Sequence, residues 1–270
     1  MNRRLSLGYL MLPGLAPPEL VRIAAQVGCS GVSLSAALSA MMTGQPSLLD
    51  DRPLRGATRQ ALRDFGIRLD LVEGVSVAPD TDLVRARSAI EVMRELGAKR
   101  FNLSVWEPDA ARASDLMSGF FEIGAELEMQ ITIEFLRLSQ VRSLKEAAAL
   151  ATSGLHPGLQ ILVDALHLAR AGETPSDVAA LDPDLIGFFQ LCDGPASSPS
   201  DEAYFHEAMH ERQIPGEGEL PLKALLEALP AEIVVALEVP MRSRAEAGVT
   251  PLERARLAAD GARRLMGSPF

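Results

Sequence analysis

The stretch from residue 68 to residue 105 reads RLDLVEGVSVAPDTDLVRARSAIEVMRELGAKRFNLSV and shows the pattern on which the fold depends. A short apolar run, Arg68–Val72, is followed by a polar loop and an amphipathic segment, Asp82–Leu96, which ends at Gly97. A second apolar run, Arg100–Val105, comes next. Short apolar runs bounded by charge or glycine predict buried strands, and a glycine just after a periodic segment predicts the end of a helix. The stretch therefore predicts one strand–helix–strand unit.

The same unit recurs along the whole chain. Further apolar runs typical of strands lie at Leu5–Leu10, Gly31–Ser35, Gln130–Phe135, Leu159–Asp164, Ile186–Leu191 and Ile233–Val239. Further amphipathic segments that predict helices lie at Pro17–Val27, Pro53–Phe65, Ser114–Glu128, Ser143–Thr152, Ser176–Leu181, Leu222–Leu229 and Leu252–Met266. Strands that alternate with helices form parallel sheets, because parallel strands need a crossover connection. Eight such units predict a (β/α)8 barrel, or TIM barrel, as a single domain over residues 1–270.

The connections between these elements bear on topology and function. The turn after the first strand reads MLPGL at 11–15, without the glycine-rich phosphate turn that an open doubly wound sheet usually carries there, so the closed barrel is favoured. The connection Cys192–Glu219 is unusually long and contains a predicted short helix, Asp201–Arg212. A second long connection, Ala36–Arg52, is a candidate mobile lid. Long loops in compact domains are often functional.

Composition excludes several classes of protein. With 26 Lys+Arg against 36 Asp+Glu, the formal net charge is −10, which disfavours nucleic acid as a partner. Two cysteines, Cys29 and Cys192, provide no disulfide framework and no cysteine-based zinc site, and they favour a cytoplasmic location. The apolar stretch Leu5–Ala16 is interrupted by Pro13 and Gly14, so it indicates a buried strand rather than a signal peptide. No segment approaches the ~18 apolar residues of a membrane span.

Three carboxylates interrupt apolar runs near the ends of predicted strands. Glu134, Asp164 and Glu238 would converge at the carboxyl end of a closed barrel, where they would repel one another unless a cation lay between them. Gln190 occupies the equivalent point of the seventh strand and could be a fourth ligand. An all-oxygen set suits Mg²⁺ or Mn²⁺ better than Zn²⁺. The alternative is that each carboxylate only caps a helix or pairs with an arginine.

Three other side chains border this predicted site. His167 follows Asp164 by three positions and is a candidate substrate-binding imidazole or proton carrier, although a structural role is the alternative. Glu73 stands where the third strand is expected to end, and either belongs to the site or borders it. Trp106 follows the fourth strand, where it would stack on a substrate ring or fill the core.

The long connection also contains a zinc-protease motif, HEAMH at 206–210. On a helix its two histidines share one face, as in zinc proteases, but no third ligand or protease context accompanies them. With Tyr204 and Arg212, this helix is better interpreted as lining the mouth of the pocket. Gly216 and Gly218 could present backbone N–H groups to a phosphate, although a plain turn is the favoured role.

These residues resemble a known family. The segment LVDALHLARAG at 162–172 is similar to the Asp-x-x-His block of the sugar phosphate isomerase/epimerase family, whose members are xylose isomerase-like TIM barrels. Similar segments follow the family's order at Ile133–Phe135, Gln190–Asp193, Pro215–Gly218 and Leu237–Pro240. The resemblance covers about half the chain. It implies one divalent metal with four ligands, namely Glu134, Asp164, Gln190 and Glu238.

The resemblance also implies the chemistry. Glu134 and Glu238 would act as acid/base groups on opposite faces of the substrate, and Arg212 and His167 would contact it. The shared reaction begins with removal of a proton next to a carbonyl. We therefore expect an isomerase or epimerase of a small polyhydroxy ketone or aldehyde, phosphorylated or not, with a homodimer left open as the assembly.

One departure from the family supports an alternative. Many epimerases of the family have histidine where this chain has Gln190, and glutamine there resembles the bacterial metal-dependent 3-dehydroshikimate dehydratases. A dehydratase of a cyclic keto compound, such as 3-dehydroshikimate or an inosose, is therefore the alternative activity. A non-catalytic binding barrel is a third class, which would bind ligands without exchanging their protons.

Overall fold

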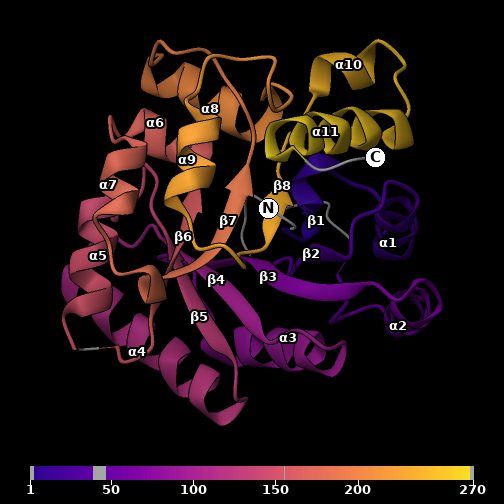
Figure 1. The fold of residues 1–270 in the computed structure, drawn as a ribbon. Coiled ribbons are helices and arrows are strands. Elements are labelled where there is room, and N and C mark those ends of the chain that lie inside the picture. Colours follow the sequence, from indigo (N-terminus) through magenta and orange to yellow (C-terminus); the bar gives the residue numbers. More distant parts are fainter. Residues whose placement is uncertain (1–2, 39–46, 155, 268–270) are drawn as a thin grey trace.

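The computed structural model describes residues 3–38, 47–154 and 156–267. Eight parallel strands close a barrel in chain order, with β8 pairing back to β1, so the predicted (β/α)8 fold is confirmed (Figure 1). The strands are β1 (Leu5–Leu7), β2 (Gly31–Ser35), β3 (Arg68–Val77), β4 (Arg100–Val105), β5 (Gln130–Glu134), β6 (Gln160–Asp164), β7 (Ile186–Leu191) and β8 (Val235–Leu237).

Helices surround the barrel on its outside (Figure 1). They are α1 (Pro17–Gln26), α2 (Arg52–Phe65), α3 (Leu83–Glu95), α4 (Ala110–Glu126), α5 (Leu144–Thr152), α6 (Ala165–Arg170), α7 (Pro175–Ala179), α8 (Asp201–His210), α9 (Leu222–Ala228), α10 (Arg242–Glu246) and α11 (Pro251–Met266). Their starts are set by local chemistry, because Asp51, Asp82 and Asp109 each accept a first-turn backbone N–H. Among the helices of the described residues, none is both long and apolar enough to span a membrane.

The structure differs from the predicted elements at several boundaries. β3 continues past the predicted end at Val72 to Val77, through an irregularity in register and a left-handed Gly74 (φ 72°). Glu73 was expected at the end of the third strand, but it lies inside β3. β1 is shorter than predicted and is followed by one turn of 3-10 helix, Tyr9–Met11. Much of the predicted lid between Ala36 and Arg52, residues 39–46, lies outside the described residues.

Two helices have no counterpart in the predicted series. α6 begins directly after β6, because the Asp164 side chain caps it by accepting the His167 backbone N–H. His167 therefore lies in the first turn of a helix and not in a loop. α10 is a single short helix before α11. The predicted helix Ser114–Glu128 begins earlier, at Ala110, behind its Asp109 cap.

The barrel interior has an apolar lower layer. Leu71, Leu162, Phe188 and Ala236 belong to a buried cluster that is separate from the main core between strands and helices. Side chains two positions apart on a strand point to the same face. Two positions after each of these residues, closer to the carboxyl end of the strand, an inward polar side chain therefore follows. In the same order these side chains are Glu73, Asp164, Gln190 and Glu238.

Candidate active site

A pocket opens at the carboxyl ends of the strands, above this apolar layer. Its floor is polar and its walls are largely apolar. The polar lining comprises Glu73, Asn102, Glu134, His167, Arg212 and Glu238, and the larger apolar side chains are Leu10, Val75, Trp106, Leu136, Leu138, Phe205 and Met209. Such a pocket, with a few convergent polar groups, is the usual form of a small-molecule site.

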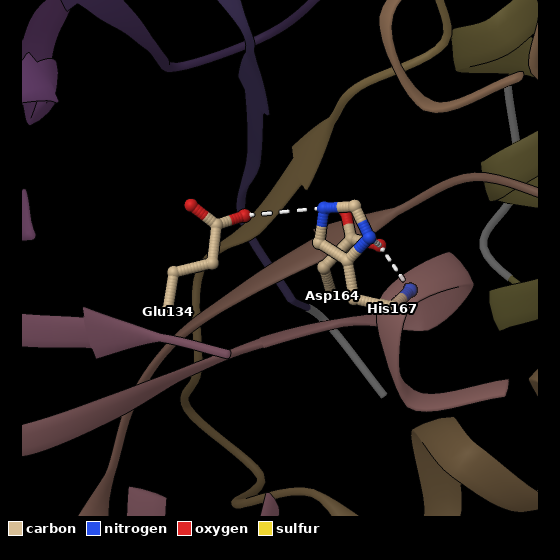
Figure 2. A group of neighbouring side chains, drawn as sticks. All are labelled: Glu134, Asp164 and His167. Carbon is tan, nitrogen blue, oxygen red and sulfur yellow. Dashed lines mark hydrogen bonds and ion pairs between the residues drawn. The ribbon is translucent and has the colours of Figure 1, made fainter. Parts of the chain in front are cut away.

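Glu134, Asp164 and His167 lie together on one side of the floor (Figure 2). One ligand atom from each lies within 4.8 Å of the others. The Glu134 Oε1 atom is 3.5 Å from His167 Nε2, and Asp164 Oδ1 accepts the His167 backbone N–H at 2.9 Å. Glu134 is held from its other side by Asn102, whose Nδ2 donates to Oε2 at 2.8 Å. Asn102 was missed by the sequence analysis, although it interrupts an apolar run as the carboxylates do.

Arg212 links two of the predicted site carboxylates. Its Nη1 lies 2.6 Å from Asp164 Oδ2, and its Nη2 lies 3.3 Å from Glu238 Oε2. Burial opposes ionisation of Asp164, but the guanidinium lowers the pKa of this carboxyl below its ordinary value. Arg212 lies just beyond the end of α8, not within the helix as predicted. Its backbone N–H donates to Pro240 O at 2.8 Å, which fixes it beside the end of β8.

Gln190 connects the carboxyl groups of Glu73 and Glu238. Its Nε2 donates to Glu73 Oε2 at 2.9 Å and to Glu238 Oε1 at 3.0 Å, while its buried Oε1 has no hydrogen-bond partner among the residues that the structure describes. Glu73 in turn accepts a hydrogen bond from Ser33 Oγ. Glu238 lies one residue beyond β8, where its backbone N–H continues the strand ladder by donating to Leu191 O. Glu73, Glu134, His167, Arg212 and Glu238 therefore line one pocket, whereas Asp164 and Gln190 are buried beside it and reach it through their hydrogen-bond partners.

The floor carries more acid than base. Burial, and then the charge of Glu238, raises the pKa of Glu134 to about 8 and that of Glu73 well above its ordinary value. Burial also raises the pKa of Glu238 to about 7, against the lowering effect of Arg212. His167 is affected in the opposite sense, because burial lowers its pKa to about 4. Four carboxyl groups thus share one guanidinium, a balance that a divalent cation would correct.

A divalent metal fits this set of donors. The Gln190 side-chain oxygen is buried and has no hydrogen-bond partner among the described residues, whereas buried polar atoms are normally paired. It is therefore available as a metal ligand. Glu134, Asp164 and Glu238 would supply the negative charge. A ring nitrogen of His167 lies close enough to Glu134 and Asp164 to share a metal ion with them.

Helix α8 covers one side of the pocket mouth. Its Tyr204 is buried, and the Tyr204 hydroxyl lies 2.7 Å from His167 Nδ1. Arg137, from the β5–α5 connection, lies over the Tyr204 ring at 4.8 Å and pairs with Asp201 at 2.9 Å. Sequence reasoning missed Arg137, since nothing along the chain marks it. Trp106 is half-buried and lines the pocket, as one of its two predicted roles required.

Two sequence motifs have structural roles instead of the chemical ones that were considered. The HEAMH segment forms the predicted helix, but its Glu207 is paired with Arg170 at 2.6 Å, and the metal-binding group found among the described residues does not include it. The backbone N–H groups of Gly216 and Gly218 donate to the Asp193 carboxylate at 2.9 and 3.0 Å. They are therefore not free to bind a phosphate.

A closed parallel barrel with acidic side chains converging at its carboxyl end defines a TIM-barrel protein whose pocket lies at the usual functional face. More narrowly, the chain belongs to the xylose isomerase-like TIM barrel family, whose model matches residues 21–266. No curated protein is detectably similar to it in sequence.

Solved structures share its fold at low sequence identity. A xylose isomerase-like TIM barrel/4-hydroxyphenylpyruvate dioxygenase fusion protein matches with 22% identity and a TM-score of 0.75, over 97% of this chain. This chain spans 42% of that longer protein. The IolI protein with a bound zinc atom matches with 16% identity and a TM-score of 0.78, over 99% of both chains. The probable 3-DHS dehydratase AsbF from Bacillus anthracis matches with 13% identity and a TM-score of 0.71, over 94% of this chain and 97% of that one.

Proposed function

We propose that this chain is a divalent-metal-dependent isomerase or epimerase of a small, unphosphorylated polyhydroxy ketone or aldehyde. The observation that carries the proposal is that Glu134 and Glu238 line the pocket from different strands of the barrel, while Gln190, buried beside Glu238, has an oxygen without a partner among the described residues. A metal bound there would polarise the substrate carbonyl and stabilise negative charge on its oxygen. Mn²⁺ or Mg²⁺ is the proposed ion.

The protein's own groups have separate tasks in this proposal. Glu134 and Glu238 exchange the proton on the carbon beside the carbonyl, one removing it and the other returning it. Each carboxyl is oriented by neighbours, Glu134 by Asn102 and Glu238 by Arg212. Because returning the proton to another carbon or face gives an isomer, a pair of acid/base groups on two sides of one pocket suits this reaction.

The pocket walls complete the site. His167 and Arg212 face the substrate from the polar side, and Trp106 from the apolar side. Glu73, which the sequence analysis placed among possible substrate contacts, also lines the cavity.

The same pocket disfavours a phosphorylated substrate. Arg212 is the one Lys or Arg that lines it among the described residues, and both of its terminal nitrogens are engaged by carboxylates. Residues 39–46, which are not described, include no Lys or Arg in the sequence. Among the described residues, a phosphate group in this pocket would therefore find no arginine or lysine free to bind it.

Dehydration of a cyclic keto compound is the second candidate. It is favoured by Gln190, which stands at the position that resembles the ligand of metal-dependent 3-dehydroshikimate dehydratases. A second observation is His167, which lines the pocket beside Glu134, where its ring could hydrogen-bond to a departing hydroxyl. Proton abstraction is the common first half of both reactions.

Solvent-proton exchange tests the proposal. Metal-loaded protein is incubated in D₂O with unphosphorylated ketoses, aldoses, inososes and cyclic hydroxy-keto acids, and products are analysed by mass spectrometry. We expect deuterium incorporation with an unchanged molecular formula for an isomerase, and loss of one water with a new conjugated absorbance for a dehydratase. Glu134→Gln and Glu238→Gln should each reduce exchange about 10²–10⁴-fold, whereas the exposed Glu227→Gln should not. Tight ligand binding without exchange would instead indicate a binding barrel.

A further inference from the structure

We propose that Glu73 is a positioning residue that holds the side-chain amide of Gln190 so that its oxygen, and not its nitrogen, is presented to the metal. This inference rests on the proposed function, because it assigns Glu73 a role toward the same metal site. Glu73 is not itself part of the group of side chains at ligand distance from one another. Its role is argued from the hydrogen bonds around it.

The hydrogen bonds have one direction. The Tyr9 backbone N–H donates to Ser33 Oγ at 3.2 Å, which leaves the Ser33 hydroxyl proton for Glu73. Glu73 then has one oxygen engaged with Ser33, and its other oxygen, Oε2, accepts from Gln190 Nε2 at 2.9 Å. A carboxyl group keeps this acceptor oxygen with or without a proton. The nitrogen of the Gln190 amide is thereby directed toward Glu73.

The second amide hydrogen is also used in this orientation. Gln190 Nε2 also donates to Glu238 Oε1 at 3.0 Å, so both of its hydrogens are used. Rotating the amide by half a turn would place its oxygen against Glu238 Oε1, where it would repel the ionised carboxylate that metal binding requires. In the observed orientation Oε1 has no hydrogen-bond partner among the described residues, and Gln190 is only 1% exposed.

This arrangement gives Gln190 what a ligating histidine obtains from a neighbouring carboxylate. Ligands of metals are commonly oriented by a hydrogen bond from their far side, and loss of that bond typically costs 10–100-fold in metal affinity. Here the bond crosses the barrel interior, since Glu73 lies on β3 and Gln190 on β7, which are opposite each other in the closed barrel. The inward position of Glu73 depends on the continuation of β3 past Val72.

Metal affinity of the metal-free protein tests the proposal without reference to turnover. Mn²⁺ and Zn²⁺ are titrated calorimetrically into wild type, Glu73→Leu and Glu73→Gln. We expect Glu73→Leu to bind about 10–100-fold more weakly. Glu73→Gln should stay close to wild type, because its amide oxygen can accept from Gln190 while its amide nitrogen donates to Ser33 Oγ. Glu107→Leu, which removes another buried carboxyl, one paired with Arg112 at 3.0 Å, is the matched control and should leave affinity unchanged.

A double-mutant cycle separates positioning from a general structural effect. If Glu73 acts through Gln190, the double variant Glu73→Leu/Gln190→Ala should bind metal no more weakly than Gln190→Ala alone. Additive losses, or unchanged binding by Glu73→Leu, would overturn the role of Glu73. If folded wild-type protein binds neither metal, the proposed metal chemistry itself fails, a result that is distinct from either of those outcomes.

Discussion

His167 is a buried imidazole whose ring nitrogens both face polar groups. Its Nδ1 lies 2.7 Å from the Tyr204 hydroxyl, and its Nε2 lies 3.5 Å from Glu134 Oε1. Burial lowers its pKa to about 4, so the ring is neutral at neutral pH. A neutral imidazole donates at one nitrogen and accepts at the other. The contact between the Tyr204 hydroxyl and Nδ1 is compatible with either direction of donation; when Tyr204 donates, the hydrogen of the ring lies on Nε2 and points toward Glu134.

This contact predicts the effect of removing one hydroxyl group. Tyr204→Phe should leave Nδ1 of His167 buried without a partner and lower the free energy of unfolding by about 1–3 kcal/mol. The double variant Tyr204→Phe/His167→Leu should cost less than the sum of the single changes, because no polar atom is then left unpaired. Urea unfolding monitored by circular dichroism measures all three. Strict additivity would show that the two side chains do not interact.

Residues that carry charge into apolar runs could be predicted from the sequence, but their partners could not. Glu134 and Asp164 stand out locally because burial of an unpaired carboxylate is costly. The bond between Tyr204 and His167 depends instead on where a long connection folds back, 37 positions along the chain. The inward position of Glu73 depends on a strand that continues past its predicted end at Val72. Tertiary context decides both features.

At the scale of the elements, the connection between β7 and α9 is held in its conformation by the carboxylate of Asp193. Asp193 accepts four backbone N–H groups, at 2.9 to 3.1 Å. The four donors are Gly194, Gly216, Gly218 and Leu220. The Pro-Gly-x-Gly motif thus closes a loop over a buried anion, close to the point where Arg212 enters the pocket.

Removal of this acceptor predicts a large loss of stability. Asp193→Ala should lower the free energy of unfolding by roughly 3 kcal/mol or more, because hydrogen bonds to a charged acceptor contribute about 1.5–3 kcal/mol each and the donors stay partly buried. Asp182→Ala, which removes an exposed cap that accepts only from Asp184 N–H, should cost about 1 kcal/mol and serves as the control. Equal losses in urea unfolding would contradict this organisation of the loop.

Helix α8 is attached to the barrel by Arg137. The guanidinium donates to Ser198 Oγ at 2.7 Å and Pro199 O at 3.0 Å, in addition to its contact with the Tyr204 ring. Arg137→Ala should therefore accelerate amide hydrogen exchange in α8 about tenfold or more, while β6 stays protected. The exposed Arg242→Ala provides the control. Unchanged exchange in α8 would show that its other contacts suffice to hold it.

The elements themselves were largely predictable because each one has its own local signal. The strands β2, β4 and β7 match the predicted ranges, since each is a mainly apolar run with clear ends. α6 was missed because Asp164 serves both as the last residue of β6 and as the helix cap, so no polar loop separates the two elements. Strand–helix alternation predicts the barrel, whereas such shared residues require the folded chain.

At the scale of the whole molecule, the acidic pocket floor couples stability to pH. Glu134 and Glu238 have raised pKa values, about 8 and about 7, so folding of the metal-free protein favours their protonated forms. This stabilisation is complete below their ordinary value of 4.5 and is lost as the pH rises through 7 and 8. His167 acts in the opposite direction, but its contribution is already complete above its ordinary value of 6.5. The window from pH 6.5 to 8 therefore isolates the carboxyl groups.

In that window the metal-free protein should become less stable as the pH rises, by up to about 1.4 kcal/mol per pH unit for each proton released. Mn²⁺ should have the reverse dependence, because its ligands must lose those protons before binding, so its stabilisation should grow from pH 6.5 to 8. Urea unfolding with and without Mn²⁺ at both pH values measures the two slopes. The double variant Glu134→Gln/Glu238→Gln should reduce both slopes, because it keeps the volume of the side chains and removes two of the groups that titrate, leaving the Glu73 carboxyl, whose pKa is also raised. A metal-free stability that is constant or rises across this window would mean that the two carboxyls are already ionised in the folded protein, and that Arg212 alone balances them.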